Sequence, residues 1–227
     1  MTIVAENIKV ILAQISHLEQ QYGRTAGSVK LLAVSKKQPM EKIVSANLAG
    51  LNDFGENYLQ EAAVKIEELK QLALCWHFIG PIQSNKTKAI AEHFQWVHSV
   101  DRVKVAQRLN QHRESSSLPL NVCVQVNLSG EASKSGTALD QTDALCREIA
   151  ELPNLKLRGL MAIPAALNNL EAQRASFRQL RDAFVRLQST YSSMDTLSMG
   201  MSGDFEAAIA EGSTLLRIGT GIFGRRD

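Results

Sequence analysis

The stretch VKLLAVSKKQPMEKIVSANLAGLNDFGE, residues 29–56, contains the pattern that decides the fold. It begins with a short apolar run, VKLLAVSK (29–36), continues with helix-like spacing in EKIVSANLAG (41–50), and ends with a second run, LNDFGE (51–56). Short, nearly continuous apolar runs are typical of strands buried on both faces of a parallel sheet. Parallel strands need a crossover connection, which is usually a helix. The stretch therefore predicts one strand–helix–strand unit.

The same alternation continues along the rest of the chain and predicts an α/β fold. About eight such units in roughly 200 residues make a short (β/α)8 TIM barrel, but one within the range of that fold. An open, doubly wound sheet is the alternative, and both architectures place the ligand site at the carboxyl ends of the strands. Beyond the first two runs, the expected strands are CWHFIG, WVHSV, LNVCVQVNL, LKLRGLMAI, DTLSMG and TLLRIG.

An amphipathic helix is expected before the barrel. Apolar residues recur at helical spacing from Ile8 to Leu18, and the helix is expected to end near Gly23. We therefore expect an N-terminal helix over 1–23 and a barrel over 29–224. Because no polar or Pro/Gly-rich linker interrupts the sequence, the whole chain, 1–227, is interpreted as one domain.

Charge and cysteine content limit the classes of partner. The 25 basic and 23 acidic residues are spread along the chain and give a net charge of +2, so neither nucleic acid nor an anionic membrane is an expected partner. The three cysteines are odd in number and far apart in the sequence, which indicates free thiols and therefore a reducing compartment. Glu6 interrupts the apolar pattern of the N-terminus and argues against a secretory signal or membrane span. A cytoplasmic location is expected.

Lys36 is the residue whose position points most directly to chemistry. It follows Leu31–Ser35 and is therefore carried to the end of a buried strand. Partial burial disfavours the ammonium form of lysine and leaves a nucleophilic amine, which suits Schiff-base formation. Because side chains alternate along a strand, Lys37 is expected to point away from the barrel if Lys36 points inward. On its position alone, a solvated lysine is the commoner outcome.

Two segments near the C-terminus are candidates for binding a phosphate. The segment Gly219–Gly224 matches the letters of the dinucleotide fingerprint, but only three residues follow it, too few for the rest of that fold. Its N–H groups and the Thr220 hydroxyl suit a single phosphate instead, and the alternative is a glycine-rich end that merely closes the barrel. Ser202 either caps the following helix or presents its hydroxyl to the same anion. Barrels often place a phosphate between the seventh and eighth loops, which hold these two segments.

Arg217 and the histidines leave two interpretations open. Arg217 lies inside an apolar strand and needs a partner, either a buried acid from another strand or an acceptor on a ligand. His77 also lies on an expected strand, where a hydrogen-bonded core histidine is commoner than a catalytic one. No metal-binding spacing is present, so no metal site is expected.

Several long motifs between Leu31 and Arg226 resemble one known family. They are LLAVSKKQP, FGENYLQEA, WHFIGPIQSNKTK, VQVNLSGEASKSG, GLMAIP and LSMGMSGDFEAAIAEGSTLLRIGTGIFG. Together they are similar to the pyridoxal phosphate homeostasis proteins, also called the YggS/PROSC family. The resemblance implies a barrel like the N-terminal domain of alanine racemase, with pyridoxal 5′-phosphate as the cofactor.

The resemblance also assigns residues to each part of that cofactor. Lys36 in AVSK would form the Schiff base, and Arg217 in LRIGT would face the pyridine nitrogen. An arginine there keeps the nitrogen unprotonated and makes the ring a poor electron sink. Gly203 and Gly221 stand where the family pattern leads us to expect more side chain. The other implied contacts are Ser202, Gly219 and Thr220 at the phosphate, and Asn57, His77 and Met201 near the cofactor.

A carrier is the function that these residues favour. Racemases of this fold use a tyrosine from a second domain, and that second acid or base appears to be missing here. No catalytic residue is therefore expected, and the chain is predicted to store or deliver pyridoxal phosphate, as a monomer or weak homodimer, to apo-enzymes. Lys134 is a candidate secondary acceptor during transfer. The alternatives are a small racemase or lyase and a protein for another phosphorylated metabolite.

Overall fold

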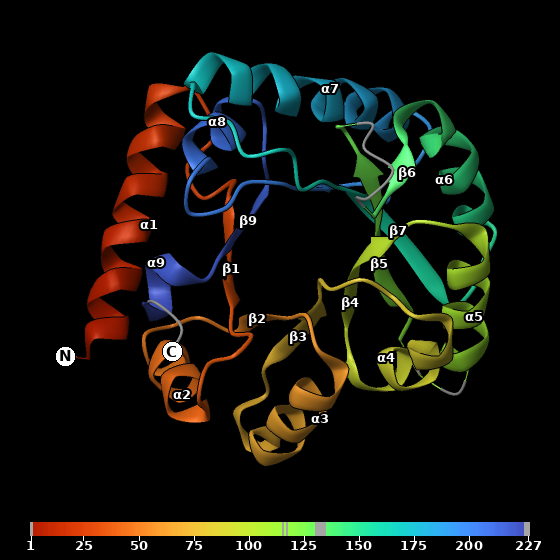
Figure 1. Cartoon of the computed structure of the whole chain (residues 1–227), viewed down its shortest axis with the longest axis horizontal. Helices are drawn as coiled ribbons and strands as arrows, with labels where there is room; N and C mark the ends of the chain where they lie inside the picture. Colours follow the sequence, from red (N-terminus) through yellow and green to blue (C-terminus); the bar gives the residue numbers. More distant parts are fainter. Residues whose placement is uncertain (1, 115, 117, 130–134, 225–227) are drawn as a thin grey trace.

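Eight parallel strands form a closed barrel in the computed structural model, which describes residues 2–114, 116, 118–129 and 135–224 (Figure 1). Neighbouring strands follow the order β4-β3-β2-β1-β9-β8-β7-β5, and pairing of β4 with β5 closes the circle. This closure confirms the predicted (β/α)8 barrel and excludes the open sheet. The strands are β1 Lys30–Val34, β2 Asp53–Glu56, β3 Cys75–Phe78, β4 Trp96–Val100, β5 Leu120–Asn127, β7 Leu155–Met161, β8 Thr196–Ser198 and β9 Leu215–Ile218, and a short β6, Thr137–Ala138, pairs with β5.

The helices lie around the outside of the barrel, as Figure 1 shows. Helix α1 runs along α2, α8 and α9, so it covers the part of the wall where the first and last strands pair. Thr2 caps α1 by accepting a hydrogen bond from the N–H of Ala5 at 3.3 Å. The helices are α1 Ile3–Gln21, α2 Met40–Leu48, α3 Leu59–Glu68, α4 Thr87–His93, α5 Val103–Arg113, α6 Thr142–Ala150, α7 Leu170–Gln188, α8 Phe205–Ala210 and α9 Thr220–Phe223, with 3-10 turns at Lys70–Leu72, Ser84–Lys86 and Leu139–Gln141.

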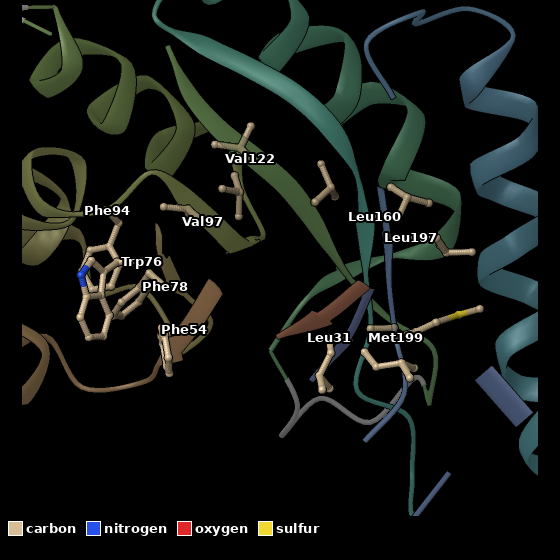
Figure 2. Close-up of a cluster of buried hydrophobic side chains, with 14 of the residues drawn as sticks. Leu31, Phe54, Trp76, Phe78, Phe94, Val97, Val122, Leu160, Leu197 and Met199 are labelled. Carbon is tan, nitrogen blue, oxygen red and sulfur yellow. The ribbon is translucent and has the colours of Figure 1, made fainter. Parts of the chain in front are cut away.

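Apolar side chains fill two separate regions. The larger one lies between strands and helices and includes Leu31, Phe54, Trp76 and Leu160, which Figure 2 shows. A small second cluster contains Leu32, Val34, Ile79 and Leu215. Since Leu31 and Leu32 belong to different clusters, β1 alternates between the outer layer and the barrel interior. The alternation carries the side chain of Lys36 toward the interior.

The remaining sequence expectations concern cysteines and membrane spans. Cys75, Cys123 and Cys146 are all free, and the last two are buried. Burial raises the pKa of Cys75 and of Cys146 to about 12, so both are thiols at neutral pH. Within the described ranges, none of the helices has the length and apolar character needed to cross a bilayer.

Candidate functional site

A cavity of about 240 Å³ opens at the carboxyl ends of β1, β2, β8 and β9. It brings together seven of the eight residues that the sequence singled out. These are Lys36, Asn57, Met201, Ser202, Arg217, Gly219 and Thr220, and the rest of the lining is Val34, Ile79, Ile163 and Gly203. The eighth, His77, does not line it. Ligand sites at this end of the strands are the rule for barrels of this type.

Lys36 is placed in the cavity by the loop that follows β1. The side chain of Lys36 is partly buried, whereas Lys37 is exposed, as the strand alternation predicts. Lys37 has φ 56°, in the left-handed region that is uncommon for residues other than glycine. Its N–H donates to Glu61 Oε1 at 2.6 Å, which ties this turn to α3. The turn changes the direction of the chain directly after Lys36.

A buried ion pair lies beneath the same loop. Lys65 Nζ donates to the main-chain oxygen of Ser35 at 2.8 Å, to Glu56 Oε1 at 2.8 Å and to Glu61 Oε1 at 2.6 Å. The Ser35 hydroxyl also donates to Glu56 Oε1, at 2.7 Å. Burial raises the pKa of Glu56, and Lys65 opposes that effect. The residue before Lys36 is therefore held on both its main chain and its side chain.

Arg217 reaches into the cavity from β9 and is 4 % exposed. Its guanidinium donates to the main-chain oxygen of Ser198 at 2.7 Å, to Ser198 Oγ at 2.8 Å and to the main-chain oxygen of Ala162 at 2.8 Å. Burial lowers the pKa of Arg217 to about 10, and the charge of Asp204 opposes this. None of the described carboxylates forms an ion pair with Arg217. Neutral oxygens, rather than the buried acid considered above, hold this cation.

The glycine segment is a helical turn and not the open loop that its letters suggest. Gly219 precedes α9, and the main-chain oxygen of Gly219 accepts from the N–H groups of Ile222 and Phe223. The first N–H groups of a helix have no partner within it and face an anion readily. Thr220 Oγ1 donates to Ser202 Oγ at 3.3 Å, so the two expected phosphate-binding hydroxyls lie side by side.

Ser202 does not cap α8. The helix begins at Phe205 with Asp204 as its N-cap, and Asp204 Oδ1 accepts from the N–H of Met201 at 2.6 Å. The exposed Ser202 hydroxyl is thus available to an anion. The two glycines that depart from the family pattern differ from each other. A Cβ on Gly221 would lie 3.0 Å from Ile218 Cγ2, whereas a Cβ on Gly203 would meet no described atom within 4 Å.

Asn57 supplies the clearest test of whether a polar ligand fits the cavity. Its Oδ1 is buried and has no hydrogen-bond partner among the described residues, although Asn57 lines the cavity. A buried acceptor without a donor costs about 1–3 kcal/mol. The fixed cation of Arg217, the paired hydroxyls and this acceptor together suit an aromatic aldehyde that carries a phosphate, a ring nitrogen and a ring hydroxyl.

His77, which was expected near the cofactor, is buried inside the barrel and is not among the residues that line the cavity. Its Nε2 lies 2.9 Å from Asp53 Oδ1, and its Nδ1 lies 2.9 Å from His98 Nε2. One imidazole nitrogen of His77, the Sγ of Cys75 and one carboxylate oxygen of Asp53 all lie within 4.8 Å of one another. Sequence spacing misses this group because its members come from two strands. Lys134, the candidate secondary acceptor, lies outside the described residues.

Comparisons with known proteins identify the family of this chain. The family model described as "Alanine racemase, N-terminal domain" matches residues 10–227. A "Pyridoxal phosphate homeostasis protein" of Pseudomonas aeruginosa is 57% identical over 100% of this chain and 97% of its own length. The structure of PipY from Synechococcus elongatus with pyridoxal phosphate bound is 36% identical, with a TM-score of 0.84, and the match covers 97% of this chain and 100% of that one.

A more distant neighbour shows the fold alone. Alanine racemase from Corynebacterium glutamicum is 16% identical, with a TM-score of 0.68 over 99% of this chain and 61% of its own. The barrel is therefore shared with enzymes whose chains extend well beyond it. By its family-model match and its full-length identity to a curated relative, the chain belongs to the pyridoxal phosphate homeostasis proteins, a family built on the alanine racemase N-terminal domain.

Proposed function

We propose that this protein binds pyridoxal 5′-phosphate as a Schiff base on Lys36 and serves in the homeostasis of that cofactor, by storing or delivering it. The observation that carries the proposal is the cavity that places Lys36, Arg217 and the Ser202–Thr220 pair around one space. The pyridoxal phosphate bound in PipY, which is 36% identical to this chain, supports the choice of ligand.

Each part of the cofactor has residues that suit it. Ser202, Thr220 and the N–H groups that follow Gly219 would hold the phosphate, because helix N-termini and hydroxyls are good anion ligands. Arg217 would donate to the pyridine nitrogen. Asn57 Oδ1 would accept from the ring hydroxyl, and Met201 would contact the ring. When bound, the cofactor supplies an electrophilic aldehyde and an aromatic ring that can accept electron density.

We propose a carrier rather than an enzyme. An arginine at the ring nitrogen donates a hydrogen bond but does not protonate it, which weakens the ring as an electron sink. Among the described residues that line the cavity, only Lys36 and Arg217 carry titratable side chains. A racemase that works with two bases needs a second proton donor opposite the lysine. Tyr58, on the loop before α3, is 48 % exposed and does not line this cavity.

The cellular setting is part of the same proposal. We infer a cytoplasmic protein of one domain, a monomer or weak homodimer, that passes pyridoxal phosphate to apo-enzymes. Transfer would be measured as activity regained by an apo-enzyme mixed with the loaded protein. A matched amount of free cofactor with a scavenging amine provides the control.

The lysine is identified by reduction of the complex. The protein is loaded with one equivalent of pyridoxal phosphate, reduced with borohydride, digested and mapped. The expected result is a label on the peptide that carries Lys36. Because Lys36 and Lys37 share a peptide, the Lys37→Ala variant serves as the control and should keep the label. A label at another lysine, or a protein that stays colourless with the cofactor, would contradict the proposed site.

The racemase or lyase alternative is separated from the carrier by proton exchange. Loaded protein is incubated with L- and D-alanine in deuterated water, and loss of the α-proton is followed by NMR. We expect no exchange above that of free cofactor. Rapid exchange that disappears in Lys36→Ala would establish an enzyme instead.

A further inference from the structure

A continuous chain of hydrogen bonds crosses the barrel interior from one end to the other. It begins at Asp53, passes through His77 and His98, reaches Ser198, and ends at Arg217 in the ligand cavity. The distances are 2.9 Å between Asp53 Oδ1 and His77 Nε2, 2.9 Å between His77 Nδ1 and His98 Nε2, 3.0 Å between His98 Nδ1 and Ser198 Oγ, and 2.8 Å between Ser198 Oγ and Arg217 Nη1. Each residue comes from a different strand.

This chain of hydrogen bonds joins opposite ends of the barrel. Asp53 is the first residue of β2 and its side chain is 45% exposed, so it lies at the amino end of the strands. His77, His98, Ser198 and Arg217 are buried. Arg217 belongs to the cavity at the carboxyl end. The barrel interior thus contains a polar path beside the small apolar cluster described above.

Donor and acceptor chemistry gives every link the same direction. A carboxylate only accepts, so His77 donates to Asp53 from Nε2. A neutral histidine that donates from one ring nitrogen accepts at the other, so His77 Nδ1 accepts from His98 Nε2, and His98 Nδ1 accepts from the Ser198 hydroxyl. A guanidinium only donates, so Ser198 Oγ accepts from Arg217. The chain runs from a cation to a carboxylate through two neutral imidazoles.

The electrostatic surroundings agree with neutral histidines. Burial lowers the pKa of His77, and burial together with the charges of His77 and Arg217 lowers the pKa of His98 well below its usual value. Burial alone would raise the pKa of Asp53, but His77, Cys75 and Lys30 outweigh it and lower the pKa. At the other end, Asp204 is the carboxylate whose charge acts on Arg217.

We infer that Asp53, His77, His98 and Ser198 are positioning residues that set the hydrogen bonding of Arg217 and couple the solvent-exposed end of the barrel to the ligand cavity. The consequence for the ligand rests on the proposed function, in which Arg217 faces the pyridine nitrogen. The chain of hydrogen bonds is a property of the protein alone and is testable without ligand.

Asp53→Lys is the test, because it changes the far end of the hydrogen-bonded chain and leaves the cavity untouched. An ammonium group only donates, so the new side chain donates to His77 Nε2 and the hydrogen of His77 moves to Nδ1. His98 must then accept at Nε2 and donate from Nδ1 to Ser198 Oγ. In the ligand-free protein, ¹⁵N NMR should show both ring hydrogens moved from Nε2 to Nδ1 and the guanidinium signals of Arg217 shifted. Asp195→Lys is the matched control, since Asp195 lies at the same end, is 55% exposed and binds Arg158 outside the hydrogen-bonded chain.

Ser198→Ala keeps the test decisive if Asp53→Lys does not fold. This variant removes the hydroxyl that links His98 to Arg217 and leaves Asp53 to hold both imidazoles. We expect the Arg217 signals to shift while His77 and His98 keep their hydrogens on Nε2. Unmoved imidazole hydrogens in Asp53→Lys, or unmoved Arg217 signals in Ser198→Ala, would overturn the inference.

The cofactor gives a second readout. With pyridoxal phosphate bound, Asp53→Lys should shift the midpoint of the pH titration of the visible absorption by at least about half a unit, whereas Asp195→Lys should not. An unchanged midpoint together with moved imidazole hydrogens would overturn the coupling to the ligand. If no variant bound the cofactor, wild type included, the proposed function would fail, and the ligand-free spectra would still decide the coupling to Arg217.

Discussion

Gly80 and Asn57 contact each other through the main chain at the edge of the ligand cavity. A Cβ built on Gly80 would lie 2.2 Å from the main-chain oxygen of Asn57 and 2.8 Å from its Cα. Real Cβ atoms do not approach main-chain atoms this closely, so any side chain at residue 80 must move the segment that carries Asn57. A glycine outside the cavity thus determines the position of a polar group inside it.

We predict that Gly80→Ala destabilises the protein by about 2 kcal/mol and weakens binding of pyridoxal phosphate, because Asn57 is displaced. Urea unfolding and titration of the visible absorption measure the two effects. Gly203→Ala is the control, since a Cβ there meets no described atom within 4 Å although Gly203 lines the same cavity. Equal binding by the two variants would mean that the position of Asn57 is unimportant.

The site residues that sequence could predict are those whose chemistry conflicts with their surroundings. Lys36 at the end of a buried strand and Arg217 inside one are conspicuous because burial of a charge demands a reason. The hydrogen-bond partners of His77 could not be predicted, because they are remote in sequence. His98 and Ser198, which continue the chain of hydrogen bonds that begins at His77, are 100 residues apart. Polar residues recur on several expected strands, and this recurrence was a signal for a polar group inside the barrel. The sequence of one strand, however, does not show which polar residues of the other strands its side chains contact.

At the scale of elements, the loop after β1 is attached to β2 and α3 through Lys65. The carboxylate of Glu56 is fully buried, and its Oε2 has no partner among the described residues. Lys65 is the only described cation that forms an ion pair with it. Loss of one member of a buried pair leaves an uncompensated charge, which costs more than the pair contributes.

Lys65→Met should therefore lower the free energy of unfolding by about 3 kcal/mol at neutral pH. Addition of Glu56→Gln to this variant should recover part of the loss, because the uncompensated charge is removed. Burial raises the pKa of Glu56, so the deficit of Lys65→Met should shrink as the pH falls and the carboxyl is protonated. Denaturant unfolding at several pH values measures both effects. A deficit that did not change with pH would show that lost packing, not charge, is responsible.

Helices α7 and α8 are joined by one buried carboxylate. Glu211, the C-cap of α8, accepts from Arg174 at 2.9 Å, from Arg178 at 3.0 Å and from Arg181 at 2.8 Å. These three arginines lie on one face of α7 because they are spaced by four and three residues. Burial alone would raise the pKa of Glu211, but the arginines outweigh it and hold the pKa below its usual value.

We predict that Glu211→Gln costs about 2 kcal/mol at neutral pH. Because the folded-state pKa is depressed, the stabilisation is complete above the unfolded value of about 4.3 and is lost as the pH falls through the folded value. The difference between wild type and variant should thus disappear in acid. Glu171→Gln, which removes an exposed partner of Arg174, is the control and should change stability little at any pH.

The elements themselves were largely predictable because most barrel strands lie in short, largely apolar runs. All eight predicted strands occur. The two elements that the sequence did not predict, β6 and α9, are short. Strand β6 has two residues, too few for any periodic signal, and α9 has four residues, all of which lie within the glycine pattern Gly219–Gly224 that sequence rules assign to a loop. In both cases pairing or packing with the rest of the barrel decides the conformation, not local propensity.

At the scale of the whole molecule, α1 is connected to the side of the cavity at which α9 begins. Asn7 Nδ2 donates to the main-chain oxygen of Ile222 at 2.9 Å, and α1 packs along α9. The first residues of α9 line the cavity. The N-terminal helix, which lies outside the βα repeat, thus supports one side of the ligand site. Ligand binding and the docking of α1 should stabilise each other.

This linkage is measurable as ligand-dependent thermal stability. Pyridoxal phosphate should raise the melting temperature of wild type, and a concentration one hundred times the dissociation constant should add about 2.7 kcal/mol. Asn7→Ala should lower the melting temperature of the ligand-free protein and also weaken the ligand affinity, because α9 loses a contact that holds it in the conformation that binds the ligand. Ser16→Ala is the control, since Ser16 is an exposed residue of α1 that lines neither the ligand cavity nor the neighbouring cavity beside α7 and α8. If Asn7→Ala changed stability but left affinity unchanged, α1 would be a cover for the barrel wall and no part of the support of the ligand site.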